Sequence, residues 1–284
     1  MDSFEWKWNT KDELEMYSKA WIPFEETKAV VCFLHGVGEH IGRYPPFAEV
    51  LTAEGYILAG FDQRGFGKSE GRRGHVSSLD EYFDDIDSFL AEVRQQFPNK
   101  PLFLIGLSMG AILALAYTPL RKPAVIGVIS FSPPLETVIK EQPLKVVLSR
   151  LLGTIIPTIT LESGLDPDTL SRDPQVAVDF INDPLVHFKI TTGWGKTMLS
   201  AIDNVYENAP SFPKPLLLLH GTNDEIAYPN SSLRVAELAP SDKVTLKMCD
   251  GFMHDLIYDP ESSQVYSIVI NWLEKQNEMI AAGN

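Results

Sequence analysis

The segment LFLIGLSMGAILALA, residues 102–116, decides the fold of this chain. Its beginning is apolar and typical of a buried strand, and its Ala- and Leu-rich part from Met109 onward is typical of a helix. Between them, Gly106 and Gly110 flank Ser108 in a G-x-S-x-G spacing. Glycines at these positions leave room for a strained strand-to-helix turn that exposes the serine oxygen. The G-x-S-x-G spacing alone is weak evidence for a nucleophile. Its position between a strand and a helix is what predicts a nucleophilic serine.

The same alternation of apolar runs and helical patterns continues on both sides of this segment. We expect strands at residues 29–34, 56–61, 102–106, 125–131, 216–220 and 244–248, and helices at 47–54, 79–97, 109–118, 231–238 and 261–274. Short apolar runs of this kind, each followed by an amphipathic helix, are typical of a parallel sheet covered on both faces. The sequence therefore predicts an α/β fold with a mostly parallel central sheet flanked by helices.

Residues 133–195 interrupt this alternation. They carry prolines at positions 133, 134, 143, 157, 167, 174 and 184, and no strand-like run that fits the sheet. Apolar residues recur there at helical spacing, namely Leu144, Val147, Leu148, Leu151, Leu152 and Ile155. We therefore expect a core domain formed by residues 1–132 and 196–284, with residues 133–195 inserted as a helical cap.

The overall charge and the two cysteines restrict the possible partners and compartment. The 284 residues have a formal net charge of -14, which repels nucleic acid phosphates, so no nucleic acid partner is expected. Cys32 and Cys249 give no disulfide framework. The chain shows no signal-peptide pattern near residue 1 and no apolar run of membrane-spanning length. We expect a cytoplasmic protein that is soluble or bound peripherally to membranes.

A serine nucleophile needs a base, and the base needs a carboxylate that holds its tautomer. In a sheet of this kind the three residues follow the order Ser, acid, His along the chain. Histidines occur at positions 35, 40, 75, 187, 220 and 254, and only the last leaves an acid after a strand between itself and Ser108. His254 follows the predicted strand 244–248 and is therefore the candidate base.

The acid should also follow a strand. In Leu216-Leu-Leu-Leu-His220-Gly-Thr-Asn-Asp224, the carboxylate comes four residues after the strand end. Asp224 is therefore the candidate acid, and Glu225 or Asp203 is the alternative.

Two backbone N–H groups should hold the oxyanion that forms during acyl transfer. Met109 follows the nucleophile and supplies the first. The second should come from the loop Leu34-His35-Gly36-Val37-Gly38-Glu39-His40 after the first central strand, where we choose Val37.

Metal and cofactor motifs are incomplete in this sequence. The spacing of His35, Glu39 and His40 matches neither H-E-x-x-H nor H-x-x-E-H. Gly67-Lys68-Ser69 resembles the end of a phosphate-binding loop, but Asp62 stands where its first glycine is required. We expect neither a metal nor an organic cofactor.

Four motifs together resemble those of the monoacylglycerol lipases, a group of α/β-hydrolases also labelled lysophospholipase-like or serine aminopeptidase-like. They are His35-Gly-Val-Gly-Glu-His40 followed by Arg43-Tyr44, Phe61-Asp-Gln-Arg-Gly-Phe-Gly-Lys-Ser69, Gly106-Leu-Ser-Met-Gly110, and His220-Gly-Thr-Asn-Asp224. The likeness extends from about residue 29 to about residue 271 and is weaker in the insertion. It implies the α/β-hydrolase fold and hydrolysis of monoacylglycerols to fatty acid and glycerol through a covalent acyl-enzyme.

The resemblance also implies a substrate site and a lipid-facing cap. Family members use residues corresponding to Glu39 and Arg43 near the glycerol end of the substrate, although Arg43 could equally pair with an acid. A cap tyrosine that helps bind glycerol in animal members is replaced by Phe180 and Ile181 near the same position. The apolar part of the cap borders an acyl channel in the family and can rest on membranes or lipid droplets.

Two other functions remain open at this point. On the same catalytic residues, the chain could be a lysophospholipase or a short-chain carboxylesterase, which differ in the head group and chain length they prefer. A non-enzymatic binding protein on this fold usually lacks a catalytic residue, and the presence of Ser108, Asp224 and His254 argues against it.

Overall fold

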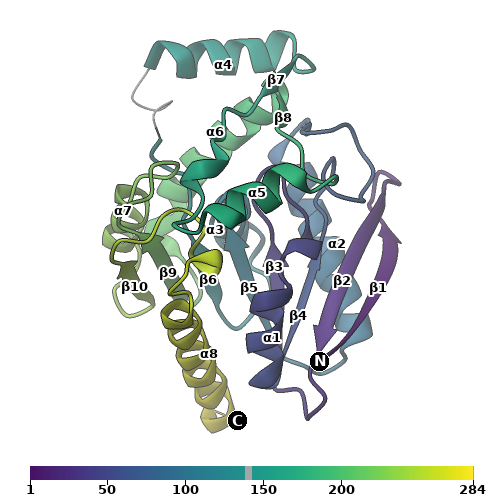
Figure 1. The fold of residues 1–284 in the computed structure, drawn as a ribbon, viewed down its shortest axis with the longest axis vertical. Coiled ribbons are helices and arrows are strands. Elements are labelled where there is room, and N and C mark those ends of the chain that lie inside the picture. The colour runs from purple at the N-terminus through teal and green to yellow at the C-terminus, as the bar shows by residue number, and fades with distance from the viewer. Residues whose placement is uncertain (138–142, 284) are drawn as a thin grey trace.

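The computed structural model, which describes residues 1–137 and 143–283, has an eight-stranded central sheet (Figure 1). The strand order is β1-β2-β4-β3-β5-β6-β9-β10, and the six strands from β4 to β10 are parallel. The strands are β1 (Asp2–Asn9), β2 (Glu15–Ile22), β3 (Ala29–Leu34), β4 (Tyr56–Phe61), β5 (Leu102–Leu107), β6 (Val128–Phe131), β9 (Leu216–Gly221) and β10 (Val244–Cys249). The mostly parallel sheet is as predicted.

Helices cover both faces of this sheet, and each face has its own apolar core. One core contains residues of α2 (Leu79–Gln96), α3 (Met109–Arg121), α6 (Thr192–Asn208) and α7 (Asn230–Leu238). The other contains residues of α1 (Pro45–Ala53) and α8 (Ser263–Gly283). Short 3-10 helices η1 (Ile41–Arg43), η2 (Pro167–Thr169), η3 (Ala209–Ser211) and η4 (Leu256–Tyr258) lie in the connections. The fully buried parallel strands explain why their sequences are continuous apolar runs.

The N-terminal hairpin of β1 and β2 was not predicted from the sequence. These strands pair with each other antiparallel, and β2 pairs antiparallel with β4 at the sheet edge. Continuous apolar runs mark strands that are buried on both faces, whereas β1 is half exposed. Its signal is the alternation of Phe4, Trp6 and Trp8 with polar residues, and Trp8 is buried with its indole N–H donating to Ser18 Oγ at 2.8 Å.

The segment between β6 and α6 lies above the carboxyl ends of the parallel strands (Figure 1). It contains α4 (Pro143–Ile155), α5 (Pro174–Asn182) and a separate antiparallel pair, β7 (Thr160–Glu162) with β8 (Lys189–Thr191). Residues 138–142 of the predicted insertion lie outside the described residues. The predicted boundary at residue 195 falls inside α6, which runs without a break from Thr192 to Asn208.

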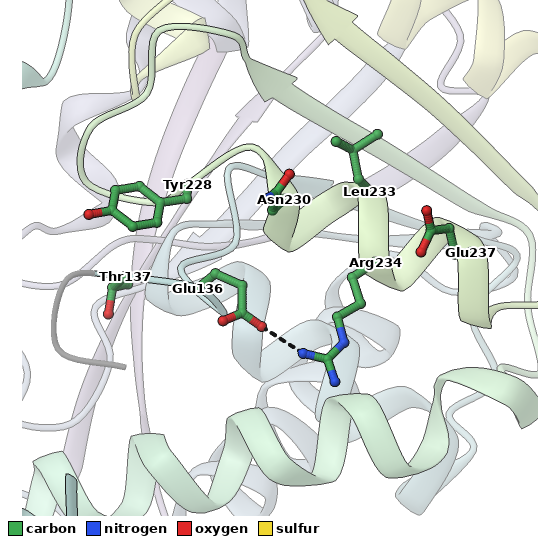
Figure 2. Close-up of a pocket in the computed structure, with 7 residues that line it drawn as sticks. All are labelled: Glu136, Thr137, Tyr228, Asn230, Leu233, Arg234 and Glu237. Atoms are coloured by element: carbon green, nitrogen blue, oxygen red, sulfur yellow. Dashed lines mark hydrogen bonds and ion pairs between the residues drawn. The ribbon is translucent and has the colours of Figure 1, made fainter. Parts of the chain in front are cut away.

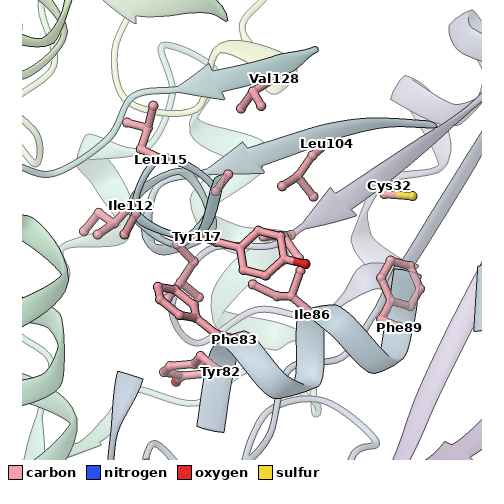
Figure 3. Close-up of a cluster of buried hydrophobic side chains, with 14 of the residues drawn as sticks. Cys32, Tyr82, Phe83, Ile86, Phe89, Leu104, Ile112, Leu115, Tyr117 and Val128 are labelled. Atoms are coloured by element: carbon pink, nitrogen blue, oxygen red, sulfur yellow. The ribbon is translucent and has the colours of Figure 1, made fainter. Parts of the chain in front are cut away.

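The core between α2, α3 and the sheet provides a direct test of packing (Figure 3). Phe89 of α2 is fully buried there, with its ring centroid 4.7 Å from that of Phe61. We expect Phe89→Ala to lower the free energy of unfolding by about 3–5 kcal/mol, because it removes apolar contacts and leaves a cavity. Urea titrations followed by tryptophan fluorescence would measure the change.

Phe24→Ala is the matched control for this substitution. The Phe24 side chain is 82% exposed, so its loss should change the free energy of unfolding by less than about 0.5 kcal/mol. Equal effects of the two substitutions would contradict the described packing of α2.

Candidate active site

Ser108 lies in a sharp turn between β5 and α3. Its backbone has φ 53° and ψ -116°, and residues other than glycine rarely adopt a positive φ. The flanking glycines are required by close approach, because a Cβ on Gly106 would lie 2.2 Å from Gly110 O and one on Gly110 would lie 2.0 Å from Leu34 O. The N–H of Ser108 donates to Phe131 O at 3.0 Å. The local structure is therefore the strained turn that the glycine spacing predicts, and it holds Ser108 at the carboxyl edge of the sheet.

Asp224 and His254 are in direct contact at the same edge. Asp224 follows β9, His254 follows β10, and His254 Nδ1 lies 2.8 Å from Asp224 Oδ2. The other carboxylate oxygen, Oδ1, accepts the N–H groups of Ile226 at 2.9 Å and Ala227 at 2.8 Å. These two bonds fix the carboxylate, which leaves Oδ2 directed at the imidazole.

The end of β6 joins the Ser108 turn to the His254 loop. Phe131 O accepts the Ser108 N–H, and the next residue, Ser132, donates from Oγ to His254 O at 2.7 Å. Both side chains are buried, at 7% exposure for Ser108 and 3% for His254. Within residues 1–137 and 143–283, no hydrogen bond joins Ser108 Oγ to the His254 ring. The structure thus brings the three predicted residues to one edge and pairs two of them directly.

Electrostatics in this buried pair favour the charged carboxylate and a basic imidazole. Burial alone would raise the pKa of Asp224, but the facing rings of His254 and His220 outweigh it and hold that pKa below its ordinary value. Burial alone would lower the pKa of His254, but Asp224, together with Asp255 and Glu39, raises it above its ordinary value. His254 is therefore a stronger base than an isolated histidine.

His220 is a supporting residue that the sequence analysis did not assign. Its side chain is fully buried at the end of β9, with Nε2 3.2 Å from Asp224 Oδ2 and 2.8 Å from Ala227 O. Its Nδ1 lies 2.8 Å from Ser232 Oγ. These contacts hold His220 beneath the carboxylate. It stands four residues before Asp224, at the start of the motif His220-Gly-Thr-Asn-Asp224, and this motif is the sequence signal for the role.

The loop after β3 approaches Ser108 closely. A Cβ on Gly36 would lie 3.4 Å from the Ser108 Cβ and 2.3 Å from Glu39 Oε1, so a larger residue there would displace the Glu39 carboxylate. Among the described residues, no backbone hydrogen bond uses the N–H of Val37 or of Met109. Both predicted oxyanion donors therefore have a backbone N–H without a described backbone acceptor; Met109 directly follows Ser108, and Val37 directly follows Gly36.

Glu39 and Arg43 form a buried ionic cluster on the same loop. Arg43 Nε lies 3.4 Å from Glu39 Oε2, and the Tyr44 hydroxyl donates to the same oxygen at 3.1 Å. Arg43 also approaches Asp183 Oδ2 at 3.6 Å and lies over the Phe180 ring at 4.9 Å. Arg43 thus pairs with acids, as the sequence allowed. Phe180 is buried beneath it.

Asp255 is a second carboxyl beside His254 that the sequence analysis did not assign. It is 4% exposed, and burial together with the nearby Glu39 raises the pKa of Asp255 to about 7. When Asp255 is ionised, its charge stabilises protonated His254. This carboxyl therefore influences the pH at which the candidate base becomes neutral.

This electrostatic link predicts the pH dependence of any reaction that uses His254 as a base. Because neutral imidazole is the active form, kcat/KM should be lost as the pH falls through the His254 pKa, which lies above the ordinary 6.5. Asp255→Asn removes a negative charge, so it should lower the His254 pKa and move this acid limb to lower pH. Profiles of kcat/KM between pH 5 and about pH 9 would measure the displacement.

Asp250→Asn is the matched control for the pH profile. Asp250 is exposed in the same loop, where its Oδ1 accepts from Thr222 Oγ1 at 3.3 Å. It is not among the principal groups that shift the pKa of His254, so its substitution should leave the acid limb in place. A shift of the acid limb of kcat/KM to higher pH in Asp255→Asn would contradict the predicted direction.

The alternative acids occupy other surroundings. Asp203 lies on α6 and forms an ion pair with Arg150 of α4 at 2.5 Å. Glu225 follows Asp224 but is exposed. Of the three candidate acids, Asp224 makes the described contact with His254.

Two surface pockets lie near this region, and Ser108 lines neither of them. One of about 460 Å³ lies beside α7 and contains the Arg234–Glu136 ion pair at 3.1 Å (Figure 2). The other, of about 350 Å³, is lined by residues that include Asp224 and Arg172.

Within residues 1–137 and 143–283, no cluster of His, Cys, Asp or Glu is arranged to hold a metal ion. Across the same residues, no helix is both long and apolar enough to cross a bilayer.

The sheet, the strained serine turn and the His–Asp pair define this chain as an α/β-hydrolase. The family model described as serine aminopeptidase, S33, matches residues 25–261, and the chain belongs to this family.

Known proteins with similar sequences include lipases. A monoglyceride lipase of Rattus norvegicus is 31% identical, over 85% of this chain and 80% of its own length. An uncharacterized abhydrolase domain-containing protein of Dictyostelium discoideum is 33% identical over 95% of this chain, which spans only 29% of that protein. The crystal structure of a Paleococcus ferrophilus monoacylglycerol lipase has a TM-score of 0.82 and 32% identity, and it covers 97% of this chain and 100% of its own. The chain is therefore a hydrolase of the lipase and esterase group.

Proposed function

We propose that this chain hydrolyses the ester bond of monoacylglycerols, releasing a fatty acid and glycerol. Ser108 is the nucleophile, His254 the general base and Asp224 the carboxylate that orients it. The observation that carries this proposal is the 2.8 Å contact between His254 Nδ1 and Asp224 Oδ2 beside the strained Ser108 turn. The relatives named monoglyceride and monoacylglycerol lipase support the choice of substrate.

The reaction proceeds through a covalent acyl-enzyme. His254 Nε2 takes the proton of Ser108 Oγ while this oxygen attacks the ester carbonyl carbon. The N–H groups of Val37 and Met109 stabilise the oxyanion of the tetrahedral intermediate. His254 then gives its proton to the departing glycerol oxygen, and the acyl chain stays on Ser108. A water molecule, deprotonated by His254, then attacks the acyl-enzyme carbonyl carbon. The bond to Ser108 Oγ breaks, His254 returns the proton to this oxygen, and the fatty acid leaves.

Glu39 supports the recognition of a hydroxylated leaving group. Its described hydrogen bond and ion pair both engage Oε2, whereas Oε1 faces Gly36, the residue whose added Cβ would also contact the Ser108 Cβ. In this proposal Oε1 accepts a hydrogen bond from a glycerol hydroxyl. Arg43 and Tyr44 hold the carboxylate in place from the other side.

Steady-state hydrolysis of four substrates tests the proposal. Monooleoylglycerol should show a higher kcat/KM than dioleoylglycerol, lysophosphatidylcholine or p-nitrophenyl butyrate, with Ser108→Ala as the blank. Preference for lysophosphatidylcholine would identify a lysophospholipase. Turnover of the butyrate ester alone would identify a short-chain carboxylesterase and would overturn the monoacylglycerol assignment.

The same proposal places α4 at a lipid surface. Apolar side chains on this helix are exposed, by 81% at Leu144, 50% at Leu148 and 52% at Leu151. A helix with such a face binds at a membrane interface through its buried apolar area. Leu148→Asp with Leu151→Asp should reduce flotation with phosphatidylcholine vesicles and leave hydrolysis of soluble p-nitrophenyl butyrate unchanged. Unchanged flotation would contradict this role of α4.

A further inference from the structure

The loop that carries His254 is held by three consecutive residues of the segment between β6 and α6. Leu170 O accepts the N–H of Asp255, the residue directly after His254, at 2.7 Å. Ser171 Oγ donates to Tyr258 O at 2.9 Å. The next residue, Arg172, makes the charged contacts. A segment far from His254 in sequence therefore holds its loop.

The Arg172 guanidinium reaches both sides of His254 along the chain. On the C-terminal side, Nε donates to Asp259 Oδ2 at 2.8 Å and Nη2 to Asp259 Oδ1 at 2.5 Å. Nη2 also donates to Glu261 Oε2 at 2.8 Å. On the N-terminal side, the guanidinium lies over the Phe252 ring at 4.8 Å. A bidentate pair fixes orientation as well as distance, and the Asp259 side chain is only 1% exposed.

We propose that Arg172 is a positioning residue for His254, because it ties the loop on both sides of the imidazole to Leu170–Arg172 of the overlying segment. The role rests on the proposed function, in which His254 is the base. Apart from its contact with Asp224 and that of its carbonyl with Ser132, no described hydrogen bond of His254 fixes the residue. Orientation of the ring therefore depends on how its loop is held, and a displacement of about 1 Å in a catalytic group can cost about 100-fold in rate.

The charge of Arg172 does not explain this role. Arg172 is not among the principal groups that shift the pKa of His254, and its guanidinium is paired with Asp259 and Glu261. Loss of Arg172 should therefore lower kcat without moving the acid limb of the pH profile. This separates it from Asp255, whose loss should move that limb.

Arg172→Gln is the test, with Arg121→Gln as a matched control. Arg121 of α3 is similarly exposed, lies over the Phe83 ring at 5.7 Å and pairs with Asp80, Asp84 and Asp87, but on the far side of the sheet from the His254 loop. Turnover of p-nitrophenyl butyrate is expressed per active site titrated with a fluorophosphonate. We expect Arg172→Gln to lower this kcat by about 10- to 100-fold and Arg121→Gln to leave it within about twofold.

A second readout needs no substrate. The proton between His254 Nδ1 and Asp224 Oδ2 should give a low-field proton NMR resonance, to be assigned by its loss in Asp224→Asn. Arg172→Gln should broaden or remove this resonance, and Arg121→Gln should retain it. If the wild-type chain hydrolyses no ester, the proposed function fails while this resonance still tests the positioning role. An unchanged resonance in Arg172→Gln, an unchanged kcat per site, or equal losses in both variants would overturn the proposal.

Discussion

Ser108→Ala is expected to lower kcat/KM for ester hydrolysis by about 10⁴-fold or more. Without the hydroxyl, the chain has no atom that can form the acyl-enzyme, and only the oxyanion donors and substrate binding remain. The substitution should also abolish covalent labelling by a fluorophosphonate. Initial rates with monooleoylglycerol and mass spectrometry of the labelled chain would measure the two losses.

Ser130→Ala is the matched control. Ser130 is a fully buried serine on β6, the strand next to β5, and its Oγ has no hydrogen-bond partner among the described residues. Its loss should leave labelling intact and activity within about threefold of the wild type, as expected for a site outside the reacting groups. Labelling that persists in Ser108→Ala would place the nucleophile at another residue.

The fold could be predicted wherever strands are buried on both faces. The expected strands at 29–34 and 56–61 coincide with β3 and β4, because every residue in them is buried and apolar character is therefore continuous. The expected strand at 125–131 is shorter in the structure, as β6 begins at Val128. Strand β1 was not predicted because an exposed edge strand has an alternating pattern instead of a continuous one, and β2 was not predicted because Ser18 and Lys19 interrupt its apolar run although most of the strand is buried.

The candidate site could be predicted as far as it follows strand ends. Ser108, Asp224 and His254 each come shortly after a parallel strand, and parallel strands bring their carboxyl ends to one edge. The supporting contacts could not be predicted in this way. Arg172 reaches Asp259 from 87 positions away, across a segment whose path is set by tertiary packing. Asp255 looks like an ordinary loop acid until its burial beside Glu39 is known.

Asp224→Asn is expected to lower kcat by about 10³- to 10⁴-fold with little change in the fold. An amide carries no charge to stabilise the imidazolium and can hold the ring in the wrong tautomer. Asp224 is the principal group that raises the His254 pKa against the effect of burial. The acid limb of the residual kcat/KM profile should therefore move to lower pH in this variant, whereas a purely structural loss would reduce the rate at every pH alike.

Two carboxylates serve as controls, because each could have been the acid from sequence alone. Glu225→Gln removes the neighbouring exposed charge, and Asp203→Asn removes the partner of Arg150 on α6. Both should keep kcat within about twofold of the wild type, since neither carboxylate makes a described contact with His254. If Glu225→Gln instead lost activity while Asp224→Asn retained it, Glu225 would be the orienting acid. The 2.8 Å contact of His254 with Asp224 would then be only a structural hydrogen bond.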